Sequence, residues 1–248
     1  MNTADNNGAA GICGRRCLIV GGGDLTPAFL KERLEAYPDA FVVAADRGLE
    51  ALKAAGRLPD HLLGDFDSAS PETFEAFLSE KAAQDGDAAR PADAAQDVID
   101  RYPSEKDFTD TEAAVRYAIS HKASEVILLG MTGGRLDHFL AAVQNMLQLL
   151  EAGIPAVMED PLNRLFLIRG KLRLVLRKEE TFGSYLSLIP VTEDLRGLTL
   201  KGMKYPLDRA QVKKGVSLCV SNEITEDEAV IDLEEGTAVV ILSRDSGR

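Results

Sequence analysis

Residues 17–27 read Cys-Leu-Ile-Val-Gly-Gly-Gly-Asp-Leu-Thr-Pro, which is an apolar run, a glycine turn and a helix start in direct succession. The apolar run predicts a strand, and Thr26 followed by Pro27 predicts an N-cap with proline at the first helical position. We expect this helix to continue to about Tyr37. The glycines either bring backbone close to a phosphate or form a simple tight turn, and both interpretations stay open.

The same alternation continues through the first two-thirds of the chain. Further strands are expected at 41–45, 61–63, 126–129 and 156–158, and further helices at 48–55, 71–83, 109–121 and 137–150. Thr109 and Glu112 have the spacing of a capping box. The Ala/Asp-rich residues 84–100 lack periodicity and are interpreted as a mobile surface insertion. The alternation predicts an α/β, Rossmann-like domain with a mostly parallel sheet that binds ligands at the carboxyl ends of its strands.

The pattern of apolar runs changes from about Asn163. Short β-like runs separated by turn residues occur at 165–168, 172–176, 185–190, 198–200, 216–220, 229–233 and 238–242. No credible long helix interrupts them, which predicts a small all-β sandwich or barrel. We therefore expect two domains, at 15–160 and 161–248.

Composition narrows the class of protein. The 248 residues are 45% hydrophobic and carry a net charge of −12, which argues against broad binding to nucleic acid or to an anionic membrane. The three cysteines show no metal-type pairing and are interpreted as reduced thiols. With no apolar run long enough to span a membrane and no signal-peptide core, we expect a cytoplasmic protein.

Asp65-Phe66-Asp67-Ser68 follows the apolar stretch at 61–64. Two carboxylates so close together repel, and a hard cation such as Mg²⁺ between them would explain the pair. Two alternatives stay open. The segment could be a solvated acidic turn in which Ser68 caps the next helix, or the nucleophile motif of an aspartyl phosphatase.

Two other segments combine charge with turn residues. Lys106-Asp107-Phe108-Thr109-Asp110 places a cation and two carboxylates at a helix entrance, where the helix dipole alone would favour Asp110. In residues 130–138, three glycines allow close backbone approach, Arg135 offers a donor fork for phosphate, and Asp137 could hold a metal or receive a proton. The alternative is a flexible loop in which Asp137 starts a helix, and His138 is expected to pack or hydrogen-bond structurally.

The inferred topology gathers these groups at one edge of the sheet. The acidic residues that follow strands are Asp24, Asp46, Asp65, Asp67 and Asp137. Ser221-Asn222, in contrast, is by itself only a turn signal. Several carboxylates with one Lys, one Arg and glycine loops indicate Mg²⁺-assisted phosphoryl or pyrophosphoryl transfer, in which the protein positions groups and neutralises charge.

In this order, the segments resemble the thiamine pyrophosphokinase (thiamin diphosphokinase) family from about Val20 to the C-terminus. The matching stretches are 45–48, 63–68, 105–110, 133–138 and 221–223. The resemblance implies an α/β domain, a C-terminal β-sandwich, and a homodimer with sites at the subunit interface. It also implies transfer of pyrophosphate from ATP to the hydroxyl of thiamine, giving thiamine diphosphate and AMP.

The resemblance further implies a role for each matched residue. Asp65, Asp67 and Asp110 would hold Mg²⁺ and the phosphates, and Asp46 and Asp137 would complete the catalytic acidic set. The residues expected to contact ATP are Lys106, Asp107, Thr109 and Arg135, and those expected at thiamine are Ser221 and Asn222.

The chain departs from some members of the family because it has no Trp for the thiamine pocket. Two rival functions remain at this point: a phosphohydrolase with Asp65 as nucleophile, and a non-enzymatic nucleotide or thiamine sensor. The phosphohydrolase would leave the Gly-Gly-Arg loop without a role, and the intact acidic set argues against the sensor.

Overall fold

The computed structural model describes residues 12–65, 74, 76–80, 98–103 and 105–247, which belong to two compact units. The first unit comprises residues up to Gly22 together with Thr26–Val126. The second comprises Gly23–Leu25 together with Ile127–Arg248. Strand β5 (Glu125–Leu129) crosses this division.

A parallel sheet forms the centre of the first unit. Its strand order is β4-β3-β2-β1, with β1 at Arg16–Val20, β2 at Phe41–Ala45, β3 at His61–Gly64 and β4 at Ile99–Arg101. Every residue of β2 and β3 is buried. Near-continuous apolar strands of this kind are expected where helices cover both faces of a parallel sheet.

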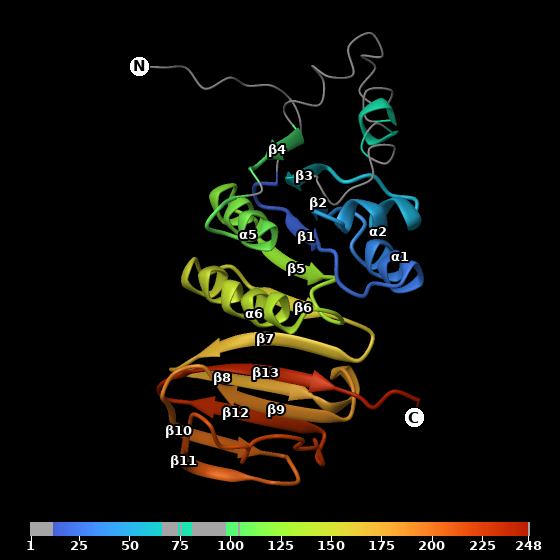
Figure 1. Cartoon of the computed structure of the whole chain (residues 1–248). Coiled ribbons are helices and arrows are strands. Elements are labelled where there is room, and N and C mark those ends of the chain that lie inside the picture. The colour runs from blue at the N-terminus through green and yellow to red at the C-terminus, as the bar shows by residue number, and fades with distance from the viewer. Residues whose placement is uncertain (1–11, 66–73, 75, 81–97, 104, 248) are drawn as a thin grey trace. The chain divides into compact units, whose positions relative to one another are not determined.

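Three helices cover this sheet: α1 (Pro27–Ala36), α2 (Gly48–Ala54) and α5 (Asp110–Ser120). The β1-α1-β2 and β2-α2-β3 connections step across the sheet in the same direction, so right-handed crossovers put α1 and α2 on one face. Helix α5 contacts β1, β2 and β3 and lies on the opposite side of these strands from α1 and α2 (Figure 1).

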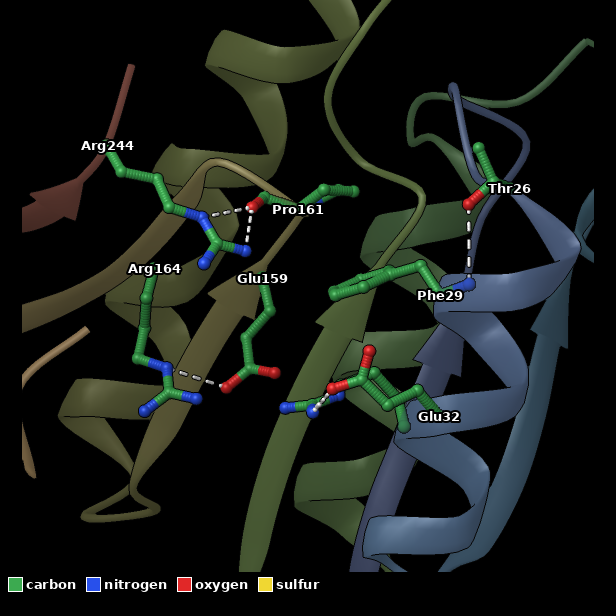
Figure 2. A network of polar contacts seen from close by, with 8 residues as sticks. Thr26, Phe29, Glu32, Glu159, Pro161, Arg164 and Arg244 are labelled. Atoms are coloured by element: carbon green, nitrogen blue, oxygen red, sulfur yellow. Dashed lines mark hydrogen bonds and ion pairs between the residues drawn. The ribbon is translucent and has the colours of Figure 1, made fainter. Parts of the chain in front are cut away.

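The helix starts follow the sequence signals closely. Thr26 accepts a hydrogen bond from the Phe29 N–H at 3.3 Å, and Pro27 begins α1, so the predicted N-cap is confirmed (Figure 2). Thr109 caps α5 by accepting from the Glu112 N–H at 3.1 Å. The Glu112 side chain pairs with Arg116 at 2.6 Å.

In the second unit, one helix accompanies two sheets. Helix α6 (Leu136–Glu151) contacts β6 and β7. The first sheet has the order β5-β6-β7-β13-β9, and the second, antiparallel sheet has the order β11-β10-β12-β8. The strands are β6 Ala156–Glu159, β7 Asn163–Arg169, β8 Leu172–Arg177, β9 Tyr185–Pro190, β10 Asp194–Lys201, β11 Leu207–Lys213, β12 Glu228–Leu233 and β13 Thr237–Ser243, with a 3₁₀ turn at Lys178–Glu180.

A single apolar core holds these two sheets together. It contains Leu188 and Val240 from the first sheet and Leu198 and Ile231 from the second, all nearly inaccessible to solvent. Interdigitating side chains from two sheet faces define a β-sandwich.

Polar contacts secure the β6–β7 hairpin of this unit. The buried Glu159 carboxylate pairs with Arg164 at 2.9 Å, and the Arg244 guanidinium donates two hydrogen bonds to the Pro161 carbonyl (Figure 2). A buried carboxylate needs such a partner because desolvation of its charge is costly.

The structure confirms the predicted fold, an α/β part with a mostly parallel sheet and an antiparallel β part, but corrects several elements. Residues 216–220 are not a strand: Val216, Leu218 and Val220 are exposed. Strands β4 and β11 were not predicted. Residues 74 and 76–80 are helical, whereas the rest of the predicted helix 71–83 and residues 84–97 of the predicted insertion lie outside the described residues. No helix in the described ranges is long and apolar enough to cross a membrane.

Candidate active site

Asp46 and Asp65 follow two neighbouring strands of the first unit. Ala45 of β2 pairs with Leu63 of β3, and the Asp46 N–H donates to the Leu63 carbonyl at 3.0 Å. Asp46 has a φ of +49° in the left-handed region, which non-glycine residues adopt uncommonly and which Asp tolerates better than most. The carboxyl ends of β2 and β3 thus present two carboxylates at the position where parallel sheets bind ligands.

Lys106 joins Asp65 to the start of α5. Its Nζ lies 2.9 Å from Asp110 Oδ1 and 3.9 Å from Asp65 Oδ2. The Lys106 side chain is only 8% exposed, and those of Asp65 and Asp110 are 16% and 20% exposed. Two part-buried carboxylates therefore converge on one nearly buried cation.

Aromatic rings form part of the surroundings of this lysine. The Lys106 Nζ lies 5.8 Å from the centroid of the Tyr102 ring, which packs edge-on against Phe108 at 5.3 Å. The ring thus presents its electron-rich face to the cation, and burial raises the pKa of the Tyr102 hydroxyl. Sequence reasoning missed Tyr102 because nothing in its spacing distinguishes it from a packing residue.

The structure leaves part of the predicted metal set undescribed. Asp67, together with Phe66 and Ser68, lies outside the described residues. Among the residues that are described, no group of three His, Cys, Asp or Glu side chains is arranged to hold a metal. Asp65 and Asp110 nevertheless offer hard oxygen donors around a position that a cation already occupies, and this donor chemistry fits Mg²⁺.

In the second unit, two glycine loops are joined through their backbones. The Gly23 N–H donates to the Gly130 carbonyl at 2.7 Å, and the Asp24 N–H donates to the Thr132 carbonyl at 2.9 Å. A Cβ on Gly23 would lie 2.5 Å from the Thr132 oxygen, and one on Gly133 would lie 2.3 Å from the Asp24 Cβ. Glycine is therefore needed at both positions because the two loops pack too closely for a side chain. The sequence alone did not show this reason for the glycines.

Arg135 and Asp137 lie at the start of α6 and pair with each other. The Arg135 Nε donates to Asp137 Oδ1 at 3.1 Å, and its Nη2 donates to Asp137 Oδ2. Both side chains are exposed, at 73% and 63%. The hydrogen bonds from Arg135 lower the pKa of Asp137 to about 2. His138, expected to pack or hydrogen-bond, is exposed.

Ser221 and Asn222 lie in the second unit and differ sharply in environment. Ser221 is exposed and has a φ of +58°, and its N–H donates to Ser187 Oγ at 3.0 Å. The Asn222 side chain is 2% exposed and binds both the N–H and the carbonyl of Tyr205 at 2.9 Å. Asn222 therefore acts as a clamp between two loops.

The sequence matches two models of one protein family. Residues 35–158 match the model described as "Thiamin pyrophosphokinase, catalytic domain", and residues 171–238 match "Thiamin pyrophosphokinase, vitamin B1 binding domain". The chain is also 33% identical over 230 residues to the thiamine pyrophosphokinase of Bacillus subtilis, covering 92% of this chain and 98% of the relative. The chain belongs to the thiamine pyrophosphokinase family.

Solved thiamine pyrophosphokinase structures share the fold. The Bacillus subtilis structure superposes with a TM-score of 0.78 at 31% identity and covers 93% of this chain and 100% of its own. The yeast thiamin pyrophosphokinase, at 16% identity and a TM-score of 0.70, covers 93% of this chain and 86% of its own and supports the fold alone. These comparisons confirm the predicted family, and with it the predicted class of enzyme, an ATP-dependent thiamine diphosphokinase.

The site residues predicted from the thiamine pyrophosphokinase resemblance fall into two groups. Asp65, Lys106 and Asp110 come together in the first unit, within the catalytic-domain match, and Asp46 follows the neighbouring strand β2. Arg135 and Asp137 pair with each other in the second unit. Ser221 and Asn222 lie within the match to the vitamin B1 binding domain.

Proposed function

We propose that the chain transfers the pyrophosphoryl group of ATP to the hydroxyl of thiamine, giving thiamine diphosphate and AMP, with Mg²⁺ bound at the carboxylates. The observation that carries this proposal is the convergence of Asp65 and Asp110 on the Lys106 ammonium, inside the segment that matches the catalytic domain. A polyphosphate needs this combination of metal-ligating carboxylates and a cation, because its transfer depends on positioning and charge neutralisation.

In this proposal Asp65, Asp67 and Asp110 hold Mg²⁺. Two of these carboxylates already face a cation, which supports the assignment of Asp65 and Asp110. When bound, the metal would neutralise charge on the phosphate oxygens. The left-handed backbone of Asp46, at the end of the strand next to β3, supports its place in the same acidic set.

ATP would be held by Lys106, Asp107, Thr109 and Arg135. Lys106 supplies a point charge and Arg135 a planar fork, which suit different oxygens of a polyphosphate. Asp137 would orient the thiamine hydroxyl or accept its proton. Its present pairing with Arg135 supports a role that begins only when a phosphate draws the guanidinium away.

Ser221 and Asn222 would form part of the thiamine pocket in different ways. Ser221 is exposed and can offer its hydroxyl to a ligand. The oxygen and nitrogen of the Asn222 side chain are already bonded to Tyr205, so we propose that Asn222 shapes the pocket by fixing that loop.

We also propose that the boundary between the two domains of the chain lies near Asp160. We further propose that the protein is a cytoplasmic homodimer. Leu136 and Leu140 lie one helical turn apart on α6 and are 75% and 61% exposed, which supports a covered apolar face in the dimer. Cys13, Cys17 and Cys219 are free, in keeping with a reducing compartment. Light scattering on Leu140→Glu should show a shift toward monomer if α6 contributes to the interface, and an unchanged mass would remove α6 from it.

A matched pair of variants on α5 tests the catalytic assignment. Asp110→Asn should reduce turnover about 100-fold or more, because a neutral amide replaces a charged metal ligand. Glu112→Gln lies two residues further along the same helix. It keeps the backbone N–H that donates to Thr109 Oγ1, so this variant should retain turnover. Circular dichroism should show that both variants are folded. Equal activity of the two variants would refute the role of Asp110.

The two rival functions make distinct predictions in the same assay. A phosphohydrolase with Asp65 as nucleophile would form a trappable acyl-phosphate and need no second substrate. A sensor would bind ATP or thiamine saturably without turnover. Thiamine-dependent consumption of ATP is expected here, without a trapped intermediate.

A further inference from the structure

Lys106 occupies the position between two carboxylates that the proposed function assigns to Mg²⁺. Its Nζ is 2.9 Å from Asp110 Oδ1 and 3.9 Å from Asp65 Oδ2, and its side chain is 8% exposed. Both carboxylates are also largely shielded from water. Without a cation between them, two shielded carboxylates would repel each other strongly.

We infer that Lys106 is a resident counter-cation that keeps Asp65 and Asp110 together in the metal-free protein and gives up its place when Mg²⁺ binds. The inference rests on the proposed metal site and goes beyond it. It assigns to Lys106 a role in the absence of nucleotide, whereas the proposed function assigns it only a contact with ATP.

The charge balance explains why the exchange would depend on nucleotide. Mg²⁺ alone must displace an ammonium that is already paired with both carboxylates, and that ammonium would then lack an acid partner. A triphosphate provides one, so the displaced ammonium can pair with phosphate oxygens. Metal and nucleotide should therefore bind with positive coupling, and the coupling must be reciprocal.

The aromatic surroundings favour an ammonium that can move over a short distance. The Tyr102 ring lies 5.8 Å from the Nζ and is braced by Phe108. A ring face stabilises a cation without a fixed hydrogen bond, so Lys106 can pivot against it while it exchanges acid partners.

Metal titration without nucleotide tests the inference directly. Isothermal titration of metal-stripped protein with MgCl₂ should show that Lys106→Met binds Mg²⁺ at least about tenfold more tightly than wild type, since a competing charged contact is removed. Lys106→Arg keeps the positive charge and should stay near wild type. The matched control is Lys31→Met, which removes an exposed lysine on α1. Equal or weaker Mg²⁺ binding by Lys106→Met would overturn the inference.

A second measurement uses the wild-type protein and so does not depend on the folding of a variant. Reductive methylation followed by mass spectrometry reports how accessible each lysine amine is. Saturating Mg²⁺ alone should accelerate the labelling of Lys106 and leave Lys31 unchanged. Unchanged or slower labelling of Lys106 would contradict its displacement.

A third measurement tests the role of Lys106 independently of the proposed reaction. A non-hydrolysable ATP analogue should increase Mg²⁺ affinity in wild type by a larger factor than in Lys106→Met. An equal factor in both proteins would mean that Lys106 does not couple the two ligands. None of these measurements involves thiamine or turnover, so the reaction and the counter-cation role can each fail without the other.

Discussion

Arg135 and Asp137 form a bidentate ion pair at the first turn of α6, although both side chains face solvent. Because the pairing favours the ionised carboxylate, the pKa of Asp137 is lowered to about 2. An aspartate with so low a pKa accepts a proton poorly at neutral pH. Asp137 would become a better proton acceptor once Arg135 turned to another anion.

The first prediction concerns the pKa of Asp137. Arg135→Gln should return this pKa to its ordinary value of about 3.9, because the guanidinium that lowers it is lost. Carbon NMR of the aspartate side chains over pH 1.5–6 would measure this directly. Pyrophosphate added to wild type should raise the same pKa if it draws Arg135 away. A value that stays near 2 in the variant would show that Arg135 is not the cause.

The second prediction concerns the pH dependence of stability. The buried His61 stacks on Tyr117 with ring centroids 4.2 Å apart, and its Nε2 lies 3.2 Å from Asp100 Oδ2. Burial lowers the pKa of His61, and the contact with Asp100 offsets this only in part. The unfolded chain therefore binds a proton near pH 6.5 before the folded protein does, so stability is lost as the pH falls below that value.

His61→Phe should reduce the loss of stability at acidic pH while keeping an aromatic ring stacked on Tyr117. The measurement is urea unfolding at pH 7.5 and 5.5, with His138→Phe as the exposed control. Asp100→Asn should steepen the loss, because it removes the carboxylate that favours the charged imidazole. An identical pH slope in wild type and His61→Phe would rule out His61 as the source.

The third prediction concerns Asn222. Asn222→Ala should reduce the free energy of unfolding by about 1–3 kcal/mol, because the buried Asn222 side chain and its part-buried hydrogen bonds to the N–H and carbonyl of Tyr205 are lost. Ser221→Ala should cost less than about 1 kcal/mol, since the exposed hydroxyl is removed but the backbone bond to Ser187 remains. Denaturant titration compares the two variants. Similar small losses of stability in both variants would refute the role of Asn222 as a clamp.

The fourth prediction compares two glycines with nearly the same backbone conformation. Gly133 and Gly153 have φ of 74° and 71°, but a Cβ would meet Asp24 at 2.3 Å only at Gly133 and would meet nothing within 4 Å at Gly153. Gly153→Ala should cost only the backbone penalty of about 1 kcal/mol. Gly133→Ala should cost clearly more and reduce turnover, because it pushes apart the two glycine loops. Equal stability and activity of the two variants would show that the loops need not stay in contact.

Much of the fold could be predicted because its signals are local. Thr26-Pro27 identified the start of α1, and the apolar run after Arg16 identified a buried strand. Strand β4 was missed because Ile99-Asp100-Arg101 is a short, charged strand at one end of the β4-β3-β2-β1 order. Residues 216–220 were wrongly predicted as a strand because the alternating Val216, Leu218 and Val220 imitate one, although these side chains are exposed.

The site was less predictable because its contacts join residues distant in sequence. The acidic motif identified Asp65, and the helix entrance identified Lys106 and Asp110. Only the fold shows that one ammonium lies between the two carboxylates. The clamp made by Asn222 depends on Tyr205, seventeen residues away, and no local pattern encodes it.

The identity of the products shows whether the chain transfers a pyrophosphoryl group. Purified protein should be incubated with ATP, Mg²⁺ and thiamine, and all nucleotides and thiamine esters should be separated by chromatography. We expect AMP and thiamine diphosphate in equal amounts, and about 100-fold less of both, or lower still, when Asp110→Asn replaces the wild-type protein. ADP together with thiamine monophosphate, or free phosphate without any thiamine ester, would rule out pyrophosphoryl transfer.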